Sequence, residues 1–160
     1  MADVFLSLGS NIGDRAANLS EAVRRLGAEP GIRVVAVSAL YRTKPVGPVA
    51  QDDFVNGAVR VETTLEPEDL MRRCLAIEAG MGRDRANSLR WGPRLIDIDI
   101  ILYGNLTLKT EMVEVPHPRF AERAFVLVPL AELAPDHRVG DRTLAQLADA
   151  VDRAGVERAD

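Results

Sequence analysis

The sequence predicts an α+β fold in which helices pack on an antiparallel sheet. Over residues 4–103, segments with strand-like and helix-like hydrophobic patterns follow one another in the order β-α-β-β-α-β. The chain has 160 residues, of which 47% are hydrophobic and 28% are charged, as in ordinary globular proteins. A chain of this size hides roughly two thirds of its unfolded surface on folding. We therefore expect residues 1–160 to form a single domain.

The first unit is a strand followed by a helix. Residues 4–8 form a short apolar run that is typical of a strand. Residues 14–26 carry apolar side chains at i, i+4 and i+7, which predicts a helix with Asp14 as its N-cap and Gly27 as its end. The segment between them, GSNIGD, lacks the lysine and the spacing of a P-loop. We interpret it as a turn rather than as a phosphate-binding loop.

Two further strands and a second helix follow. Residues 32–40 are rich in β-branched side chains, and residues 54–62 alternate between apolar and polar side chains, so both are predicted strands. Prolines and glycine in residues 41–53 predict a loop between them. Pro67 marks the start of a helix whose apolar stripe contains Cys74. As the only cysteine, Cys74 is expected to be a small buried hydrophobic residue.

The second half begins with a polar segment and the strongest strand pattern in the chain. Gly80 and Gly82 are expected to end the second helix, and residues 83–94 form an arginine-rich loop. Residues 95–103 are the predicted fourth strand. Additional helices are expected near residues 126–133 and 144–151. The complete order is the split βαβ, or ferredoxin-like, plan with helices on one sheet face, plus C-terminal helices. The plan alone does not indicate a function.

Composition excludes several classes of protein. The net charge of −4, from 24 acidic and 20 basic residues, argues against a protein that coats nucleic acid. A single cysteine excludes an internal disulfide and a cysteine-based metal site. No apolar stretch has the length of a membrane span, and the N-terminus lacks a basic region followed by an apolar run. We therefore expect a cytoplasmic protein that binds neither nucleic acid nor membrane.

The most informative segment is RWGPRLIDIDII, residues 90–101. Successive side chains of a strand alternate between its faces, so Asp97 and Asp99 point the same way, roughly 6.5–7 Å apart. Neighbouring ionised carboxylates repel each other, and a divalent cation removes that repulsion. Carboxylate oxygens suit Mg²⁺, which keeps several waters and is often shared with phosphates. The alternative is a solvent-facing edge strand that uses aspartate for solubility.

Basic residues flank the acid pair on both sides. Arg83, Arg85, Arg90 and Arg94 precede it, and His117, Arg119 and Arg123 follow it. Guanidinium groups bind phosphate oxygens in pairs, and a histidine held between prolines can donate to phosphate. Arginines beside magnesium-binding carboxylates are typical of polyphosphate sites. A general need to neutralise acidic residues explains the number of arginines but not their clustering.

Four residues suggest a flat ring as a second ligand. Trp91 lies in the polar loop, Phe54 opens a strand, and Phe125 follows the Arg123 segment. Each could stack on a ring or could equally be a packing residue. Asn56 shares the face of Phe54 and could bind the polar edge of such a ring. Residue chemistry therefore predicts magnesium, a polyphosphate and a flat ring.

These segments resemble a known family, 6-hydroxymethyl-7,8-dihydropterin pyrophosphokinase of folate biosynthesis. The resemblance runs from about residue 4 to residue 136 and is strongest in RWGPRLIDIDIILYG. The other matching segments are FLSLGSNIGDR, YRTKPVGP, FVNGAV, IEAGMGR and VPHPRFAERAFVLVPLAELAP. It implies an enzyme that transfers the pyrophosphoryl group of ATP to the pterin hydroxymethyl group and releases AMP. The implied partners are ATP and the dihydropterin, and we expect a monomer.

The resemblance also implies a role for individual residues. The implied catalytic residues are Arg83, Arg94, Asp97 and Asp99, with two Mg²⁺ ions held by Asp97 and Asp99. The implied nucleotide-binding residues are Glu78, Arg85, Arg90, Trp91, Ile100, His117 and Arg123. The implied pterin-binding residues are Thr43, Lys44, Pro45, Val46, Phe54, Asn56 and Phe125. Loops at residues 47–53 and 83–90 would close over both substrates and exclude water.

This sequence departs from the family pattern in three places. Phe54 replaces a tyrosine of some members, Pro118 replaces an aromatic residue that contacts phosphate, and the loop at residues 82–91 is one residue longer than in some relatives. No residue stands out as a general base, so activation of the alcohol by metal is a hypothesis. The alternative function is a non-catalytic ferredoxin-like module that binds a small molecule or RNA. Only 4% of the residues are aromatic, which disfavours the RNA version.

Overall fold

The computed structural model describes residues 1–44, 50–82 and 95–159. Its main sheet has the strand order β10-β3-β4-β1-β5, and β2 also pairs with β4. Neighbouring strands are antiparallel throughout. The strands are β1 (Ala2–Ser10), β2 (Ile32–Val37), β3 (Tyr41–Thr43), β4 (Phe54–Thr63), β5 (Asp97–Tyr103) and β10 (Val156–Arg158). The order β5-β1-β4-β2 is that of the ferredoxin-like plan, so the predicted fold class is confirmed.

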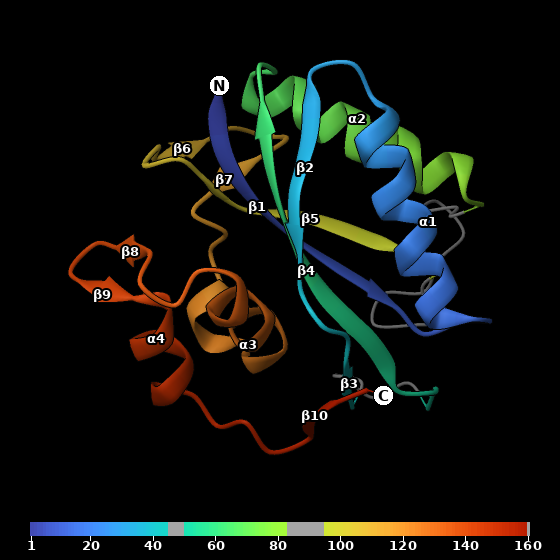
Figure 1. Ribbon diagram of the computed structural model, residues 1–160, viewed down its shortest axis with the longest axis vertical. Coiled ribbons are helices and arrows are strands. Elements are labelled where there is room, and N and C mark those ends of the chain that lie inside the picture. Colours follow the sequence, from blue (N-terminus) through green and yellow to red (C-terminus); the bar gives the residue numbers. More distant parts are fainter. Residues whose placement is uncertain (45–49, 83–94, 160) are drawn as a thin grey trace.

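Helices lie on both faces of this sheet (Figure 1). The first two, α1 (Arg15–Ala28) and α2 (Pro67–Gly80), cover one face, and the C-terminal pair, α3 (Ala124–Leu133) and α4 (Leu144–Ala150), lies against the other. The short elements are the 3₁₀ helix η1 (Phe120–Glu122) and the pairs β6–β7 (Leu108–Lys109, Glu114–Val115) and β8–β9 (Arg138–Val139, Arg142–Thr143). No helix among the described residues is long and apolar enough to cross a bilayer.

The alternation of side chains along β1 explains why both faces are covered. Leu6 and Leu8 belong to the apolar core beneath α1 and α2. Phe5 points the other way and packs in a second core with residues of α3 and α4, including Leu127 and Leu130. Because each face of the sheet presents apolar side chains, each needs a helical layer. The predicted layer of helices on one face therefore consists of α1 and α2. The C-terminal helices α3 and α4 form a second layer on the other face.

The ends of α1 confirm one prediction and correct another. Asp14 is the N-cap, and its Oδ1 accepts a hydrogen bond of 3.1 Å from the backbone N–H of Ala17. The predicted end at Gly27 is wrong, because the helix continues to Ala28. The chain reverses at Gly31 instead, where φ is +87°. A left-handed residue of this kind favours glycine, which is why Gly31 rather than Gly27 makes the turn.

The predicted loop at residues 41–53 also needs correction. Its first three residues form β3, which pairs with β4 and with β10. The predicted strand at residues 32–40 correspondingly stops at Val37. At the break between β2 and β3, Ser38 Oγ accepts a hydrogen bond of 2.9 Å from the N–H of Ala58. The partner strand β10 lies more than one hundred residues away, so no local pattern marks β3.

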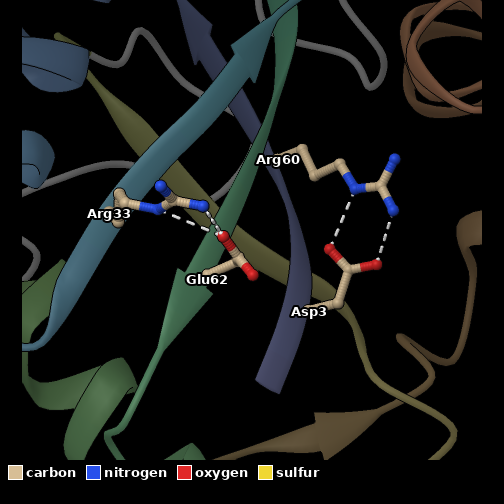
Figure 2. A network of polar contacts seen from close by, with 4 residues as sticks. All are labelled: Asp3, Arg33, Arg60 and Glu62. Atoms are coloured by element: carbon tan, nitrogen blue, oxygen red, sulfur yellow. Dashed lines mark hydrogen bonds and ion pairs between the residues drawn. The ribbon is translucent and has the colours of Figure 1, made fainter. Parts of the chain in front are cut away.

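A polar network covers part of the sheet face on which Phe5 lies (Figure 2). Arg60 donates two hydrogen bonds to the carboxylate of Asp3, of 2.9 Å and 2.8 Å, and its guanidinium lies over the Phe5 ring. Arg33 of β2 pairs with Glu62 of β4. These side chains are about one third exposed or more, so each pair contributes about 1 kcal/mol or less to stability.

Candidate active site

A cavity of about 530 Å³ opens on the sheet face that also carries α3 and α4. It is lined by residues of five segments that are far apart in the sequence. These are Ser7 and Gly9; Thr43, Lys44, Phe54 and Asn56; Asp97 and Asp99; Arg119, Glu122, Arg123, Ala124 and Phe125; and Asp152, Ala154, Gly155 and Val156. A second cavity, which is lined mostly by apolar residues such as Leu8 and Leu19, has a volume of about 180 Å³.

The acid pair lies on the side of β5 that faces the first of these cavities. Asp97 and Asp99 are half-buried, whereas Ile98 between them is fully buried in the core. The prediction that the two carboxylates share one face is therefore confirmed. Their partners across the strand pair are Gly9 and Ser7, which are small and leave open space beside the carboxylates.

The chemistry of the acid pair suits a hydrated divalent cation. No cluster of three or more potential metal ligands occurs in residues 1–44, 50–82 and 95–159. Two carboxylates alone fit Mg²⁺, because this ion usually keeps several waters and takes the rest of its ligands from substrate phosphates. They do not fit an ion such as structural zinc, which needs four protein ligands.

The cavity is also lined by side chains that are expected to bind a ring. Asn56 is buried and its Nδ2 donates a hydrogen bond of 2.6 Å to Thr43 Oγ1, which joins β4 to β3. Phe54 and Phe125 both line the cavity. A Cβ atom on Gly9 would lie 2.7 Å from Asn56 Oδ1, so the close approach of β1 requires glycine there.

The turn GSNIGD holds the chain that leads into Phe54. Asn11 donates hydrogen bonds of 2.7 Å to Gln51 Oε1 and 3.1 Å to the carbonyl of Asp52. Arg15 donates a hydrogen bond of 2.6 Å to the carbonyl of Asp53. These contacts support the interpretation of this segment as a structural turn. They also give it a second role, because they fix the entry to β4.

Basic residues also line the cavity. Arg119 and Arg123 line it, and the Arg123 guanidinium lies 5.7 Å from the centre of the Phe125 ring. No ion pair links either arginine to an acid within the part of the chain that the structure describes. Both guanidinium groups are therefore placed to bind an anionic ligand.

His117 is not among the residues that line the cavity, and its backbone is bonded to β5. Its N–H donates a hydrogen bond of 2.8 Å to the carbonyl of Ile101. Its Nδ1 accepts a hydrogen bond of 3.2 Å from the N–H of Arg119, so in the neutral ring the proton is on Nε2. Burial lowers the pKa of His117, and the charge of Arg123 lowers it further. At neutral pH the ring is therefore an uncharged donor through Nε2.

Two further predicted nucleotide-binding side chains, besides His117, do not line the cavity. Glu78 is 1% exposed, and its Oε2 accepts a hydrogen bond of 2.8 Å from the N–H of Ile98. Ile100 is also buried in the core beneath α1 and α2. Both side chains lie on the opposite face of the sheet because they belong to that core. In the structure, Glu78 therefore serves to hold α2 against β5.

The remaining predicted residues have different outcomes. Burial raises the pKa of Cys74 to about 12, with the charge of Glu78 as the next cause, which agrees with its interpretation as a buried hydrophobic residue. Seven predicted site residues lie outside the described residues: Pro45, Val46, Arg83, Arg85, Arg90, Trp91 and Arg94.

Sequence reasoning missed one side of the cavity. The segment at residues 152–156 lines it, although this segment was expected only to follow a final helix. It contains no periodic pattern and no chemical motif. Gly155 is the only signal, since glycine marks a turn but does not indicate what the turn contacts.

Fold and site together define a class: a ferredoxin-like α+β protein in which paired acids, arginines and two aromatic rings surround one cavity. Comparison with known sequences identifies the particular family. The chain belongs to the 7,8-dihydro-6-hydroxymethylpterin-pyrophosphokinase (HPPK) family, whose model matches residues 5–135. It is therefore an enzyme, as the resemblance implied.

Curated relatives cover nearly the whole chain. The 2-amino-4-hydroxy-6-hydroxymethyldihydropteridine pyrophosphokinase of Methylorubrum extorquens is 51% identical over 158 residues, which are 99% of each chain. A protein of the same name from Pseudomonas aeruginosa is 44% identical and covers 97% of this chain and 95% of its own. The bifunctional protein FolKE of Lactococcus lactis subsp. cremoris is 48% identical over 133 residues, or 83% of this chain and 38% of that protein.

Solved structures support the fold independently of sequence. An HPPK-DHPS structure in complex with substrates superposes with a TM-score of 0.73 at 12% identity, over 93% of this chain and 43% of that chain. The wild-type HPPK-DHPS of Plasmodium falciparum with pteroate gives a TM-score of 0.72 at 14% identity, over 92% and 44%. This chain thus spans less than half of those two proteins, and at such identities the likeness concerns the fold alone.

Proposed function

We propose that this enzyme transfers the β,γ-pyrophosphoryl group of ATP to the hydroxymethyl oxygen of 6-hydroxymethyl-7,8-dihydropterin in folate biosynthesis. The new bond joins the alcohol oxygen to the β-phosphorus, the bond between the β-phosphorus and the α,β-bridging oxygen breaks, and AMP leaves while the alcohol loses its proton. Family membership supports the reaction. The single observation that carries it to this site is the presence of Asp97, Asp99, Phe54 and Phe125 around one cavity.

The acids and arginines of the cavity form the proposed triphosphate site. Asp97 and Asp99 would hold two Mg²⁺ ions, which when bound neutralise phosphate charge and favour in-line displacement. Arg119 and Arg123 would donate to phosphate oxygens, as guanidinium groups commonly do. His117 would add a neutral hydrogen-bond donor through Nε2. These donors orient the triphosphate and stabilise the charge that develops on the transferred group.

Four predicted arginines and a tryptophan belong to the same proposal. By their positions in the family motif, Arg83 and Arg94 are the proposed catalytic arginines. Arg85, Arg90 and Trp91 are the proposed contacts to the nucleotide. The family motif alone supports these roles, because all five residues lie outside the described part of the chain.

The aromatic side chains of the cavity, together with Asn56, form the proposed pterin site. Phe54 and Phe125 would enclose the ring, a contact worth about 0.5–1.5 kcal/mol for each aromatic pair. The buried Asn56 is oriented by its bond to Thr43, so its amide oxygen is available to a ring N–H donor. The backbone from Thr43 to Val46 would bind the remaining ring edge. Because the acids line the same cavity as the aromatic pair, the hydroxymethyl group of the enclosed ring would point toward the phosphates.

We also propose that residues 1–160 act as a single cytoplasmic domain and as a monomer, with ATP and the dihydropterin as partners and with no role for nucleic acid. The monomer is tested by light scattering of the purified protein. The expected mass is 17.4 kDa. Twice that mass would contradict a monomer.

Product analysis tests the proposed reaction. The protein is incubated with Mg²⁺, ATP and 6-hydroxymethyl-7,8-dihydropterin, and the nucleotides are separated by chromatography. We expect one AMP for each pterin consumed, and no AMP when either Mg²⁺ or the pterin is omitted. Formation of ADP instead of AMP would contradict the proposal. Binding of the pterin without turnover would favour the non-catalytic module.

A further inference from the structure

We propose that residues 152–156 form a C-terminal wall that positions the residues of the proposed pterin site and so acts in substrate recognition. This inference rests on the proposed function and assigns a part of the chain that lies beyond the family match at residues 5–135. Four residues of the wall line the cavity directly: Asp152, Ala154, Gly155 and Val156.

The wall is tied to the strand that carries Thr43. Val156, the first residue of β10, is the register partner of Thr43, and Glu157 and Arg158 pair with the two residues before it. One more hydrogen bond of 2.8 Å runs from the N–H of Ala159 to the carbonyl of Leu40. β3 is only three residues long, and it lies between β4 and β10. β10 therefore fixes the outer side of a strand too short to be stable alone.

Thr43 connects β3 to Asn56, the predicted pterin contact. Its side chain is buried, and Thr43 Oγ1 accepts the hydrogen bond of 2.6 Å from Asn56 Nδ2. A shift of β3 would lengthen that bond and free the Asn56 amide to rotate. The chain of contacts thus runs from β10 through β3 to the side chain that we expect to bind the ring.

Gly155 gives the wall its second contact. Its φ of +84° is a left-handed conformation that favours glycine. The side chain of Lys44 lies against it, since a Cβ atom at Gly155 would be 3.8 Å from Lys44 Cγ and Cδ. The turn before β10 is itself ordered, because Asp152 Oδ1 accepts a hydrogen bond of 2.9 Å from the N–H of Ala154. The wall therefore supports both Thr43 and Lys44.

The residues of the proposed triphosphate site are held by other elements. Asp97 and Asp99 belong to β5, which pairs with β1 at the opposite edge of the sheet from β10. Arg123 is held at the start of α3. Loss of the wall should therefore weaken pterin binding far more than ATP binding. If the wall only stabilised the fold, its loss would weaken the binding of both substrates to a similar extent.

Steady-state kinetics of a variant that ends at Arg153 tests this inference. Its control is Glu157→Gln, which alters an exposed side chain of β10 whose pairing with Arg42 is a surface contact of 3.4 Å. For the shortened protein we expect the KM for the pterin to rise about tenfold, because one or two hydrogen bonds that order Thr43 and Asn56 are lost. The KM for ATP and the values for Glu157→Gln should stay at the wild-type level.

A point variant keeps the test decisive if the shortened protein does not fold. Gly155→Ala introduces strain at a left-handed position beside Lys44. Gly140→Ala introduces the same strain at φ +65° in the β8–β9 turn, where nothing lies within 4 Å of the added Cβ. Only Gly155→Ala should raise the KM for the pterin.

The outcomes separate this inference from the proposed reaction. If the KM values for the pterin and for ATP rise in parallel, or if the KM for the pterin is unchanged, the proposed role of the wall is overturned. Absence of AMP with the wild-type protein overturns the proposed reaction instead. The wall is then judged by the Kd of the pterin, measured from ligand fluorescence with the same variants, and equal Kd values would overturn it.

Discussion

Small residues shape the cavity as much as its charged residues do. Gly9 lies on β1 directly opposite Asn56, and Ser7 lies opposite Asp99. A larger residue at position 9 would meet the Asn56 amide, which is buried and hydrogen-bonded to Thr43 and so has little freedom to move. The steric requirement at Gly9 and the orientation of Asn56 are therefore one feature of the site.

Gly9→Ala tests this requirement. The added methyl group should displace Asn56 and raise the KM for the pterin about fivefold, the cost of a hydrogen bond worth about 1 kcal/mol. Gly27→Ala is the control, because its new Cβ lies 3.6 Å from Val34 and fits without displacement. That change should stabilise α1 by about 0.5–1 kcal/mol and leave KM unchanged. An unaltered KM in Gly9→Ala would show that Asn56 does not bind the ring.

His117 makes stability depend on pH. Because its pKa in the folded protein is lowered from 6.5, the native state resists a proton that the unfolded state accepts. The contribution of His117 to the free energy of unfolding is therefore fully present above 6.5, the pKa of the unfolded state. That contribution is lost as the pH falls from 6.5 toward the lower folded pKa.

Urea unfolding measures this dependence. The free energy of unfolding should fall between about pH 8 and about pH 5, and the fall should be smaller in His117→Gln, which cannot take up the proton. NMR titration of the wild-type ring should give a midpoint below 6.5. Equal pH dependence in both proteins, or a midpoint above that value, would contradict the burial of this ring.

At the scale of elements, the sequence predicted what local patterns determine. The four long strands and the helices α1 to α4 follow from periodicity, and the face of Asp97 and Asp99 follows from the alternation of strand residues. β3 and β10 could not be predicted, because each is three residues long and depends on a partner far along the chain. The burial of side chains such as Glu78 could not be predicted for a related reason, since burial depends on tertiary packing.

The capping box of α4 gives a prediction for one element. Thr143 Oγ1 accepts a hydrogen bond of 3.1 Å from the N–H of Gln146, whose Oε1 accepts one of 2.8 Å from the N–H of Thr143. Thr143→Ala removes the side-chain cap and should lower the free energy of unfolding by about 1 kcal/mol, whereas Thr143→Ser should retain it. Equal losses in the two variants, measured by urea unfolding, would contradict the cap.

At the scale of the whole molecule, the two faces of the sheet have different roles. One face is covered by α1 and α2 and forms a closed apolar core. The other packs against α3 and α4 over part of its area and leaves the ends of β1, β4 and β5 open to the cavity. RWGPRLIDIDII contributes to both faces, because Ile96, Ile98 and Ile100 enter the closed core while its acids face the open cavity. This dual demand explains why this segment was the most informative part of the sequence.

The central claim is that Asp97 and Asp99 bind the divalent cations that accompany ATP. Asn substitutions at both positions should lower kcat by at least about a thousandfold, or ~4 kcal/mol of transition-state stabilisation, whereas Asp149→Asn on the exposed side of α4 should not change it. Circular dichroism establishes that the variants retain the fold.

Binding of Mn²⁺, followed by electron paramagnetic resonance with a non-hydrolysable ATP analogue, tests the claim most directly. The wild-type protein should bind about two ions per chain in the presence of the analogue. The variant with both Asp97→Asn and Asp99→Asn should lose this binding, and Asp149→Asn should retain it. Wild-type Mn²⁺ binding in the double variant would contradict the assignment of the acid pair.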